Sequence, residues 1–360
     1  MKKLKFAIIG CGRISKNHIK AIIDNSDIAQ LVSVCDVARE RATLCKEAYE
    51  NNELIQGKVS TFSNFKEMLD KVDIDAVAIA TESGYHSEIA IYSMIKGNHV
   101  LVEKPMALSI EDADKMIKCA KNNSVKLCVC HQNRFNPSIK KLRTSIEEGS
   151  FGKLINGTAR ILWNRTMDYY NKAPWRGTWK LDGGTLMNQC IHNIDLLQWM
   201  LGGEIVSVYG QCGTFLRNIQ GEDFGSIIIR FKNGAIGIVE GSACVYPENL
   251  EETLSIFGEK GTVVIGGLAV NEIKIWRFEN EDEKYVKSKF QFPINNVYGS
   301  GHTPLYRDFI ASIIEDKDPL VTGEEGKKAL SIVLAAYKSQ KTNTIINFPL
   351  DSFSTMDMIK

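Results

Sequence analysis

The first 130 residues alternate short apolar runs with longer amphipathic segments. The apolar runs predict strands at Leu4–Ile9, Leu31–Cys35, Val59–Phe62, Ala76–Ala80, Val100–Val102 and Leu127–Val129. The amphipathic segments predict helices at Ser15–Asn25, Arg39–Tyr49, Asn64–Asp70, Tyr85–Ile95 and Ile110–Asn122, the third of them capped by Ser63. Apolar strands that alternate with helices are typical of a parallel sheet buried on both faces. We therefore expect an N-terminal α/β domain.

After about residue 150 the pattern changes to longer strand-like runs separated by turn signals. The clearest runs are Ser226–Phe231, Ala235–Val239 and Leu254–Phe257, and Asn233-Gly234 is a hairpin signal. Helices are expected near Gly184–Leu201, Pro304–Ile314 and Gly326–Ser339. This pattern predicts an α+β domain with a large, mostly antiparallel sheet. We place the domains at residues 1–125 and 126–360.

Charge and cysteine content narrow the class of protein. The 360 residues carry 44 Lys+Arg against 43 Asp+Glu, so there is no broad basic field for nucleic acid or an anionic membrane. No apolar stretch approaches the roughly 18 residues of a membrane span, and the run Phe6–Ile9 is too short for a signal peptide. The nine cysteines, an odd number, favour reduced thiols and a cytoplasmic location. Cys128 and Cys130 fit buried strand positions better than a zinc site, because a second ligand pair is missing.

A glycine-rich turn follows the first predicted strand. In Gly10-Cys11-Gly12-Arg13-Ile14-Ser15 the first glycine permits a tight turn, and the second lets the backbone approach a diphosphate at a helix N-terminus. Ser15 replaces the usual third glycine but is still small. Asp36, at the end of the second strand, is placed to accept hydrogen bonds from a ribose and to repel a 2′-phosphate. The sequence therefore predicts a Rossmann sheet that binds NAD rather than NADP.

Two further segments carry candidate acid–base residues. Lys104 follows the strand that ends at Val102, where ligands of parallel sheets bind. His192 lies in the helix expected near residues 184–201, with Asn188 and Asp195 on the same face, and Asp195 is expected to orient the imidazole ring. An ordinary surface lysine and a structural histidine are the alternatives. A metal site is disfavoured, because asparagine is a poor zinc ligand and no third ligand is apparent, so we expect no metal.

The turn Gly10–Ile14, the motif Glu103-Lys104-Pro105 and the segment Gly183–Asp195 together resemble the Gfo/Idh/MocA oxidoreductases along nearly the whole chain. The resemblance implies that Lys104 and His192 are catalytic and flank the nicotinamide and the reacting carbinol. Cofactor-binding residues that we expect are Gly10, Gly12, Arg13, Ile14, Asp36, Thr81, His86, Glu103, Lys104, Gln132, Trp175 and Arg176. Two positions depart from the family: Asn188 stands where an aspartate is usual, and Glu82 where a proline is usual.

Further segments, among them Gln132-Asn133-Arg134, Trp175–Trp179 and Tyr246–Glu251, are similar to bacterial UDP-N-acetyl-2-amino-2-deoxyglucuronate dehydrogenases (WlbA/WbpB type). This resemblance implies oxidation of the 3-hydroxyl of a UDP-N-acetylhexosaminuronate to the 3-keto sugar, in surface-polysaccharide precursor synthesis. It also implies a homotetramer formed through the second-domain sheets. Substrate-binding residues are expected at Lys104, Arg165, Asn188, Gln189, His192 and Tyr298. Arg165 and Arg176 are candidate partners for phosphate or carboxylate groups.

Two other functions remain open at this point. One is a dehydrogenase for a free sugar, for inositol or for UDP-N-acetylglucosamine, which would be recognised by showing no dependence on the uridine diphosphate moiety. The other is a non-catalytic NAD-binding sensor, which needs the glycine turn but no acid–base pair such as Lys104 and His192. If NADH stays bound, 2-oxoglutarate is a candidate hydride acceptor for turnover.

Overall fold

The computed structural model describes residues 3–55, 57–202, 204–293 and 299–359. The chain divides into two compact units. The first comprises Met1–Ala107, Glu111–His131 and His302–Lys327, and the second comprises Leu108–Ile110, Gln132–Gly301 and Lys328–Lys360. Residues 302–327, which the sequence analysis assigned to the second domain, therefore cluster with the N-terminal residues.

The first unit contains a six-stranded sheet in the order β3-β2-β1-β4-β5-β6. Its strands are β1 (Leu4–Ile9), β2 (Ala29–Cys35), β3 (Ser60–Phe62), β4 (Ala76–Ile79), β5 (His99–Val102) and β6 (Leu127–Val129). Every neighbouring pair is parallel. The predicted Rossmann sheet is confirmed, and its central strands β4 and β5 are almost wholly apolar and buried because helices cover both faces.

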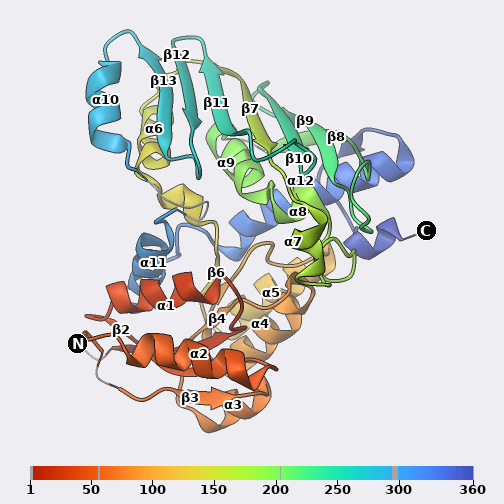
Figure 1. Cartoon of the computed structure of the whole chain (residues 1–360). Helices are drawn as coiled ribbons and strands as arrows, with labels where there is room; N and C mark the ends of the chain where they lie inside the picture. The colour runs from red at the N-terminus through yellow and green to blue at the C-terminus, as the bar shows by residue number, and fades with distance from the viewer. Residues whose placement is uncertain (1–2, 56, 203, 294–298, 360) are drawn as a thin grey trace. The chain divides into compact units, whose positions relative to one another are not determined.

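The helices of the first unit are α1 (Ser15–Asp24), α2 (Arg39–Glu50), α3 (Phe65–Lys71), α4 (His86–Ile95), α5 (Ile110–Asn122) and α11 (His302–Ile314). Helix α1 packs against α2 and against α11, which returns from the C-terminal part of the chain (Figure 1). Phe6 of β1 packs on Tyr306 and Phe309 of α11, with ring centroids 5.4 and 6.4 Å away. Aromatic packing of this kind makes α11 part of the core of the first unit.

The N-terminus of α3 differs from the expected one. Asn64, not Ser63, is the capping residue: its Oδ1 accepts hydrogen bonds from the backbone N–H groups of Lys66 at 2.9 Å and Glu67 at 3.3 Å. Both residue types are good caps, so the sequence alone did not distinguish them. Asn64 is selected because its extended backbone stands directly before the first helical residue, Phe65.

The second unit contains an eight-stranded sheet in the order β13-β12-β11-β7-β10-β9-β8-β14. Its strands are β7 (Leu154–Leu162), β8 (Ile205–Gly213), β9 (Phe224–Phe231), β10 (Ile236–Ser242), β11 (Glu251–Gly258), β12 (Gly261–Gly266), β13 (Glu272–Phe278) and β14 (Ile346–Asn347). All neighbours are antiparallel except β7 and β10, which are parallel. The mostly antiparallel sheet is confirmed.

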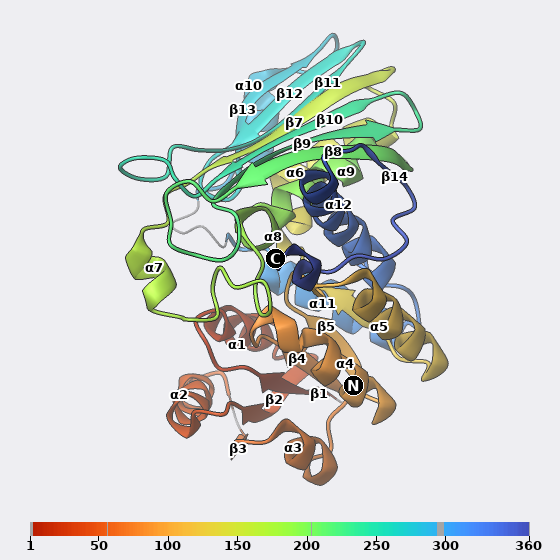
Figure 2. The same ribbon diagram turned by 90° about the vertical axis from the view of Figure 1, so that its right-hand side faces the viewer.

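Helices pack on one face of this sheet, as Figure 2 shows. The helical elements of the second unit are η2 (Gln132–Phe135), α6 (Pro137–Glu147), α7 (Met167–Asn171), α8 (Thr185–Asn188), α9 (Ile191–Leu201), α10 (Glu283–Phe290), most of α12 (Gly323–Thr342) and η3 (Thr355–Met358). In β9, Ile227 and Ile229 are fully buried whereas Ile228 is 53% exposed. Ile236 and Ile238 of β10 are also exposed, so the other face of the sheet carries apolar side chains.

The single helix expected near residues 184–201 is two helices. Helix α8 ends at Asn188 and α9 begins at Ile191. The N–H groups of Gln189 and Cys190 both bond to the carbonyl of Thr185, which closes α8 and ends the regular helical spacing. Asn188, His192 and Asp195 are consequently not successive positions on one helical face.

Within the described residues, no helix combines the length and hydropathy needed to cross a membrane.

Candidate active site

The carboxyl ends of β1, β2, β4 and β5 lie side by side in the first unit. The backbone N–H of Gly10 bonds to Cys35 O at 2.9 Å, that of Ala80 to Ile9 O at 2.7 Å, and that of Glu103 to Ile79 O at 2.9 Å. This register brings the expected residues Gly10, Asp36, Thr81 and Lys104 to one edge of the parallel sheet, since each lies one or two residues after the end of a strand. That edge is where ligands of such sheets bind.

The glycine-rich turn has the shape that a diphosphate requires. Gly10 has φ +96°, and a Cβ added there would lie 2.5 Å from the backbone of Ala80, so only glycine fits. A Cβ added at Gly12 would meet no atom within 4 Å, which leaves open space above the turn. Arg13 and Ile14 complete the turn. Ser15 begins α1, and its hydroxyl donates to Gly12 O at 2.6 Å, which explains why serine is tolerated there.

Asp36 holds the same turn from the neighbouring strand. Its Oδ2 accepts a hydrogen bond from the Cys11 N–H and its Oδ1 accepts one from the Ala38 N–H, both at 2.8 Å. The carboxylate is only 8% exposed. Each oxygen keeps a lone pair after these bonds, so the group can still accept from two ribose hydroxyls. The open space at Gly12 and the acceptor at Asp36 fit a dinucleotide with an unphosphorylated ribose.

His86 lies within hydrogen-bonding distance of two loops at this edge, the one after β4 and the one after β5. Its Nδ1 lies 2.8 Å from the carbonyl of Pro105 and its Nε2 lies 3.1 Å from the carbonyl of Thr81. Burial lowers the pKa of the imidazole, which is 1% exposed. Both ring nitrogens therefore face backbone oxygens, and the ring joins the loop after β4 to the residue that follows Lys104.

Glu103 is not exposed to solvent: it is buried between two helices. Its Oε2 accepts a hydrogen bond from the Lys104 N–H at 3.2 Å, and its Oε1 lies 3.2 Å from His18 Nε2 and 3.5 Å from His302 Nε2. Burial opposes ionisation, but the two imidazoles hold the pKa of Glu103 well below its usual value. The sequence analysis missed His18 and His302, because they lie on helices far apart in the chain.

In the second unit, four of the expected residues gather around Tyr169. Arg165 Nε donates to Gln189 Oε1 at 3.0 Å, and Gln189 Nε2 donates to the Tyr169 hydroxyl at 3.0 Å and also to Asn188 Oδ1. The guanidinium of Arg176 lies 4.1 Å from the Tyr169 ring centroid and that of Arg165 lies 5.4 Å from it. Burial raises the pKa of the Tyr169 hydroxyl, which stays neutral as a hydrogen-bonding group.

This cluster is suited to an anion. The Nε atoms of Arg176 and of nearby Arg217 are buried and have no hydrogen-bond partner in the described structure. Arg217 Nη2 donates to the side chain of Asn164, whose backbone carbonyl accepts from Arg165. Two buried N–H donors on positive groups match phosphate or carboxylate oxygens. Tyr169 and Arg217 were not predicted, and the only sequence signal was the aromatic residues between the arginines.

The remaining expected residues are distributed as follows. His192 lies half-buried in the first turn of α9, and Gln132 is buried in η2. Trp175 is half-buried beside Arg176, and Tyr298 lies outside the described residues. Asp195 makes a buried bidentate ion pair with Arg134, at 2.7 and 2.6 Å, and so anchors α9 to η2. Each of its oxygens is thus bonded to a guanidinium, a contact that the sequence analysis did not anticipate.

A buried carboxyl supports the loop that precedes α8. Glu222 Oε1 accepts from the Leu186 N–H at 2.7 Å and from the Tyr337 hydroxyl at 3.0 Å. A Cβ at Gly184 would lie 1.5 Å from Glu222 Oε2, so glycine is required for this close approach. Burial raises the pKa of Glu222 to about 8.

We expect this carboxyl to make the unfolding free energy depend on pH. The pKa of an unfolded glutamate is about 4.3, and that of Glu222 in the folded chain is about 8. Between these two pH values the folded chain binds the proton more tightly than the unfolded chain does. Stability should therefore fall as pH rises through this window, by about 1.4 kcal/mol per pH unit from this group. Glu222→Gln should remove that slope in urea unfolding at pH 5.5, 6.5 and 7.5, whereas the exposed Glu248→Gln should keep it. Equal slopes in wild type and Glu222→Gln would contradict the assignment.

Comparisons with known proteins agree with this geometry. Residues 4–131 match the oxidoreductase family with an NAD-binding Rossmann fold, and residues 139–264 match the GFO/IDH/MocA C-terminal domain. A relative, the myo-inositol 2-dehydrogenase of Thermotoga maritima, is 26% identical over 343 residues, which are 93% of this chain and 96% of that protein.

Two solved structures are similar over nearly the whole chain. The WlbA dehydrogenase from Bordetella pertussis, in complex with NADH and UDP-GlcNAcA, is 37% identical with a TM-score of 0.87, covering 97% of this chain and 100% of that one. The WlbA dehydrogenase from Chromobacterium violaceum, in complex with the same two ligands, is 34% identical with a TM-score of 0.89, covering 98% and 97%.

Proposed function

Because the chain belongs to the Gfo/Idh/MocA family of NAD-dependent oxidoreductases, we propose that it oxidises the 3-hydroxyl of a UDP-N-acetylhexosaminuronate to a ketone. The observation that carries this proposal is the cluster around Tyr169, where Arg165 and Arg176 stand beside the amides of Asn188 and Gln189. Guanidinium groups suit the anionic parts of such a substrate, and amides suit its hydroxyls. Similarity to dehydrogenases solved with UDP-GlcNAcA supports the same substrate class.

The chain's own residues supply binding and proton transfer. NAD, when bound, supplies the hydride acceptor. Gly12 offers open space and α1 offers N–H donors to the diphosphate, while Asp36 accepts from the adenosine ribose. In this proposal Lys104 donates a hydrogen bond to the reacting hydroxyl, and His192 takes up the proton as the carbon is oxidised. His86 and Glu103 position Lys104 through Pro105 O and the Lys104 N–H.

Arg165 is assigned to the negatively charged part of the sugar nucleotide. Its guanidinium is held by Gln189, by the Asn164 carbonyl and by Asn249 Oδ1 at 3.1 Å, so its orientation is fixed before a ligand arrives. Arg176 is restrained by the Tyr169 carbonyl at 2.7 Å and keeps a buried Nε without a partner in the described structure. Two preorganised cations of this kind favour a dianionic or more highly charged substrate over a neutral polyol.

The proposal is tested by mixing the protein with NAD and a panel of alcohols and following NADH absorbance. UDP-N-acetylglucosaminuronate should be oxidised with a kcat/KM at least tenfold above that of UDP-N-acetylglucosamine, and NADP should not replace NAD. Arg165→Leu should raise KM for the uronate about tenfold, or about 1.4 kcal/mol, with little effect on kcat. Arg307→Leu, on α11 of the first unit, where the arginine pairs with Asp27 on the surface, is the matched control.

Other outcomes would select the rival functions. Equal activity with myo-inositol would favour a polyol dehydrogenase, the activity of the Thermotoga maritima relative. Binding of NAD without oxidation of any alcohol would favour a sensor. Because tightly held NADH would mask turnover, each assay is repeated with 2-oxoglutarate as acceptor.

We also propose a cytoplasmic homotetramer formed through the exposed isoleucine face of the sheet in the second unit, with light scattering as its test.

A further inference from the structure

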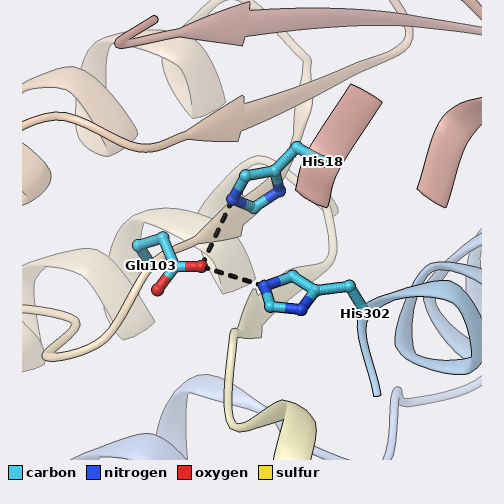
Figure 3. Close-up of side chains that lie close together, drawn as sticks. All are labelled: His18, Glu103 and His302. Carbon is cyan, nitrogen blue, oxygen red and sulfur yellow. Dashed lines mark ion pairs between the residues drawn. The ribbon is translucent and has the colours of Figure 1, made fainter. Parts of the chain in front are cut away.

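Three titratable side chains from distant segments converge inside the first unit. His18 lies on α1, Glu103 follows β5, and His302 is the first residue of α11. One potential ligand atom from each lies within 4.8 Å of the other two. The three side chains point toward one another (Figure 3). Their exposed fractions are 0%, 7% and 4%, so water does not solvate them freely.

The converging atoms lack hydrogen bonds. Glu103 Oε1 lies 3.2 Å from His18 Nε2 and 3.5 Å from His302 Nε2. These distances suit ion pairs, but none of the three atoms has a partner with hydrogen-bond geometry in the described structure. Buried polar atoms are nearly always satisfied, so three unsatisfied atoms at one place indicate a missing occupant.

The separations of these atoms fit a small cation. Ligands about 2.0–2.1 Å from a tetrahedral zinc ion lie about 3.3 Å from one another. The distances from Glu103 Oε1 to the two imidazole nitrogens are 3.2 and 3.5 Å, one slightly shorter and one slightly longer than that value. Two imidazoles and one carboxylate are ligands that select a zinc-like transition metal, since Mg²⁺ and Ca²⁺ prefer oxygen alone.

The outer contacts of the ligands are also in place. His18 Nδ1 lies 2.8 Å from the Tyr306 hydroxyl, which fixes the ring so that Nε2 faces Glu103. The second oxygen of Glu103 accepts from the Lys104 N–H at 3.2 Å. Metal-binding imidazoles and carboxylates characteristically use their remaining atoms in this way.

We propose that His18, Glu103 and His302 bind one zinc-type divalent cation, with a non-protein ligand in the fourth position. The ion would join β5 to α1 and α11 immediately before Lys104. The site shares Glu103 with the loop that positions Lys104, but the cation takes no part in the proposed dehydrogenase reaction, and its test involves no substrate. The sequence analysis expects no metal, since it considered only the segments around Cys128 and around Asn188 and His192; His18, Glu103 and His302 form no motif along the chain.

The experiment uses the full chain without a histidine tag, stripped with a chelator and then dialysed. Titration with Co²⁺ should give visible d–d absorbance, and zinc added in excess should remain at about one ion per chain after desalting, measured by mass spectrometry. Zinc should also raise the midpoint of thermal unfolding, because it binds the folded state. Glu103→Gln and His302→Gln should lose the Co²⁺ band and the retained zinc.

A matched control uses another histidine of the same unit. His99→Gln alters a ring that accepts from the Lys126 N–H, away from the three ligands, and should bind zinc as wild type does. If Glu103→Gln fails to fold, Tyr306→Phe removes one hydroxyl and should weaken zinc binding about 10–100-fold. A wild-type chain that retains no zinc and shows no Co²⁺ band overturns the proposal. Zinc retention that is unchanged in His302→Gln, or a zinc affinity that is unchanged in Tyr306→Phe, overturns it equally.

Discussion

Replacing Lys104 by methionine should lower kcat about a thousandfold, within the 10²–10⁴ range of general acid–base catalysis. Methionine keeps much of the aliphatic stem but lacks the ammonium group that hydrogen-bonds the reacting hydroxyl. The backbone N–H that bonds to Glu103 Oε2 at 3.2 Å is unchanged, so the loop should keep its shape. Affinity for NADH, measured by fluorescence titration, should stay within about threefold, or 0.7 kcal/mol.

The control for this experiment is Lys96→Met, a lysine at the end of α4 that pairs with Asp70 on the surface. Its kcat should equal that of wild type, since an exposed pair contributes little. His192→Gln should also lower kcat, and the double variant should lose less than the product of the two single losses, because both residues serve one proton transfer. Near-normal turnover by Lys104→Met would remove that residue from the mechanism.

Gly12→Val should weaken NAD binding about 100-fold, or about 2.7 kcal/mol, while leaving the fold intact. A Cβ added at Gly12 would meet no atom within 4 Å, so we expect the apo protein to accommodate the side chain. The same open space is what we assign to the diphosphate, and a branched side chain would occupy it. NADH titration measures the affinity, and thermal unfolding without ligand should show an unchanged midpoint.

Gly10→Ala provides the contrast within the same turn. A Cβ there would lie 2.5 Å from the Ala80 backbone, and the φ of +96° is strained for any other residue. This variant should lose both stability and NAD binding. The prediction for Gly12 is wrong if its valine variant unfolds as early as the alanine variant of Gly10, or if it binds NADH with wild-type affinity.

The sequence predicted those parts of the fold whose signals are local. Apolar strands such as Ala76–Ile79 and the turn at Gly10–Gly12 carry their own conformational preferences, and parallel pairing then brings their ends together. The cap of α3 was predicted at Ser63 instead of Asn64, because both residue types are good caps. The break after Asn188 was not predicted, because tertiary contacts shape this segment. Glu222 under Leu186 is one such contact.

The residues that were missed are those that the fold collects from separate segments. His302 reaches Glu103 only because α11 packs on α1, and Tyr169 stands between Arg165 and Arg176 through ring stacking that no spacing rule describes. The ion pair of Asp195 was missed for the same reason: Arg134, 61 positions away in the chain, binds it in the core. The chemistry of each side chain could be predicted from the sequence, but the residues that surround it in the fold could not.

The return of α11 to the first unit bears on how the protein is synthesised. Helix α1 and the ring of Phe6 are covered by Tyr306 and Phe309, and Arg307 pairs with Asp27. A nascent chain that has reached residue 131 has all six strands of the parallel sheet but lacks this covering helix. Its apolar surface stays exposed until the ribosome has made nearly the entire protein. We therefore expect the N-terminal unit, although its first residues are translated early, to complete folding only after residues 302–327 have been made, and to depend on chaperones during that interval.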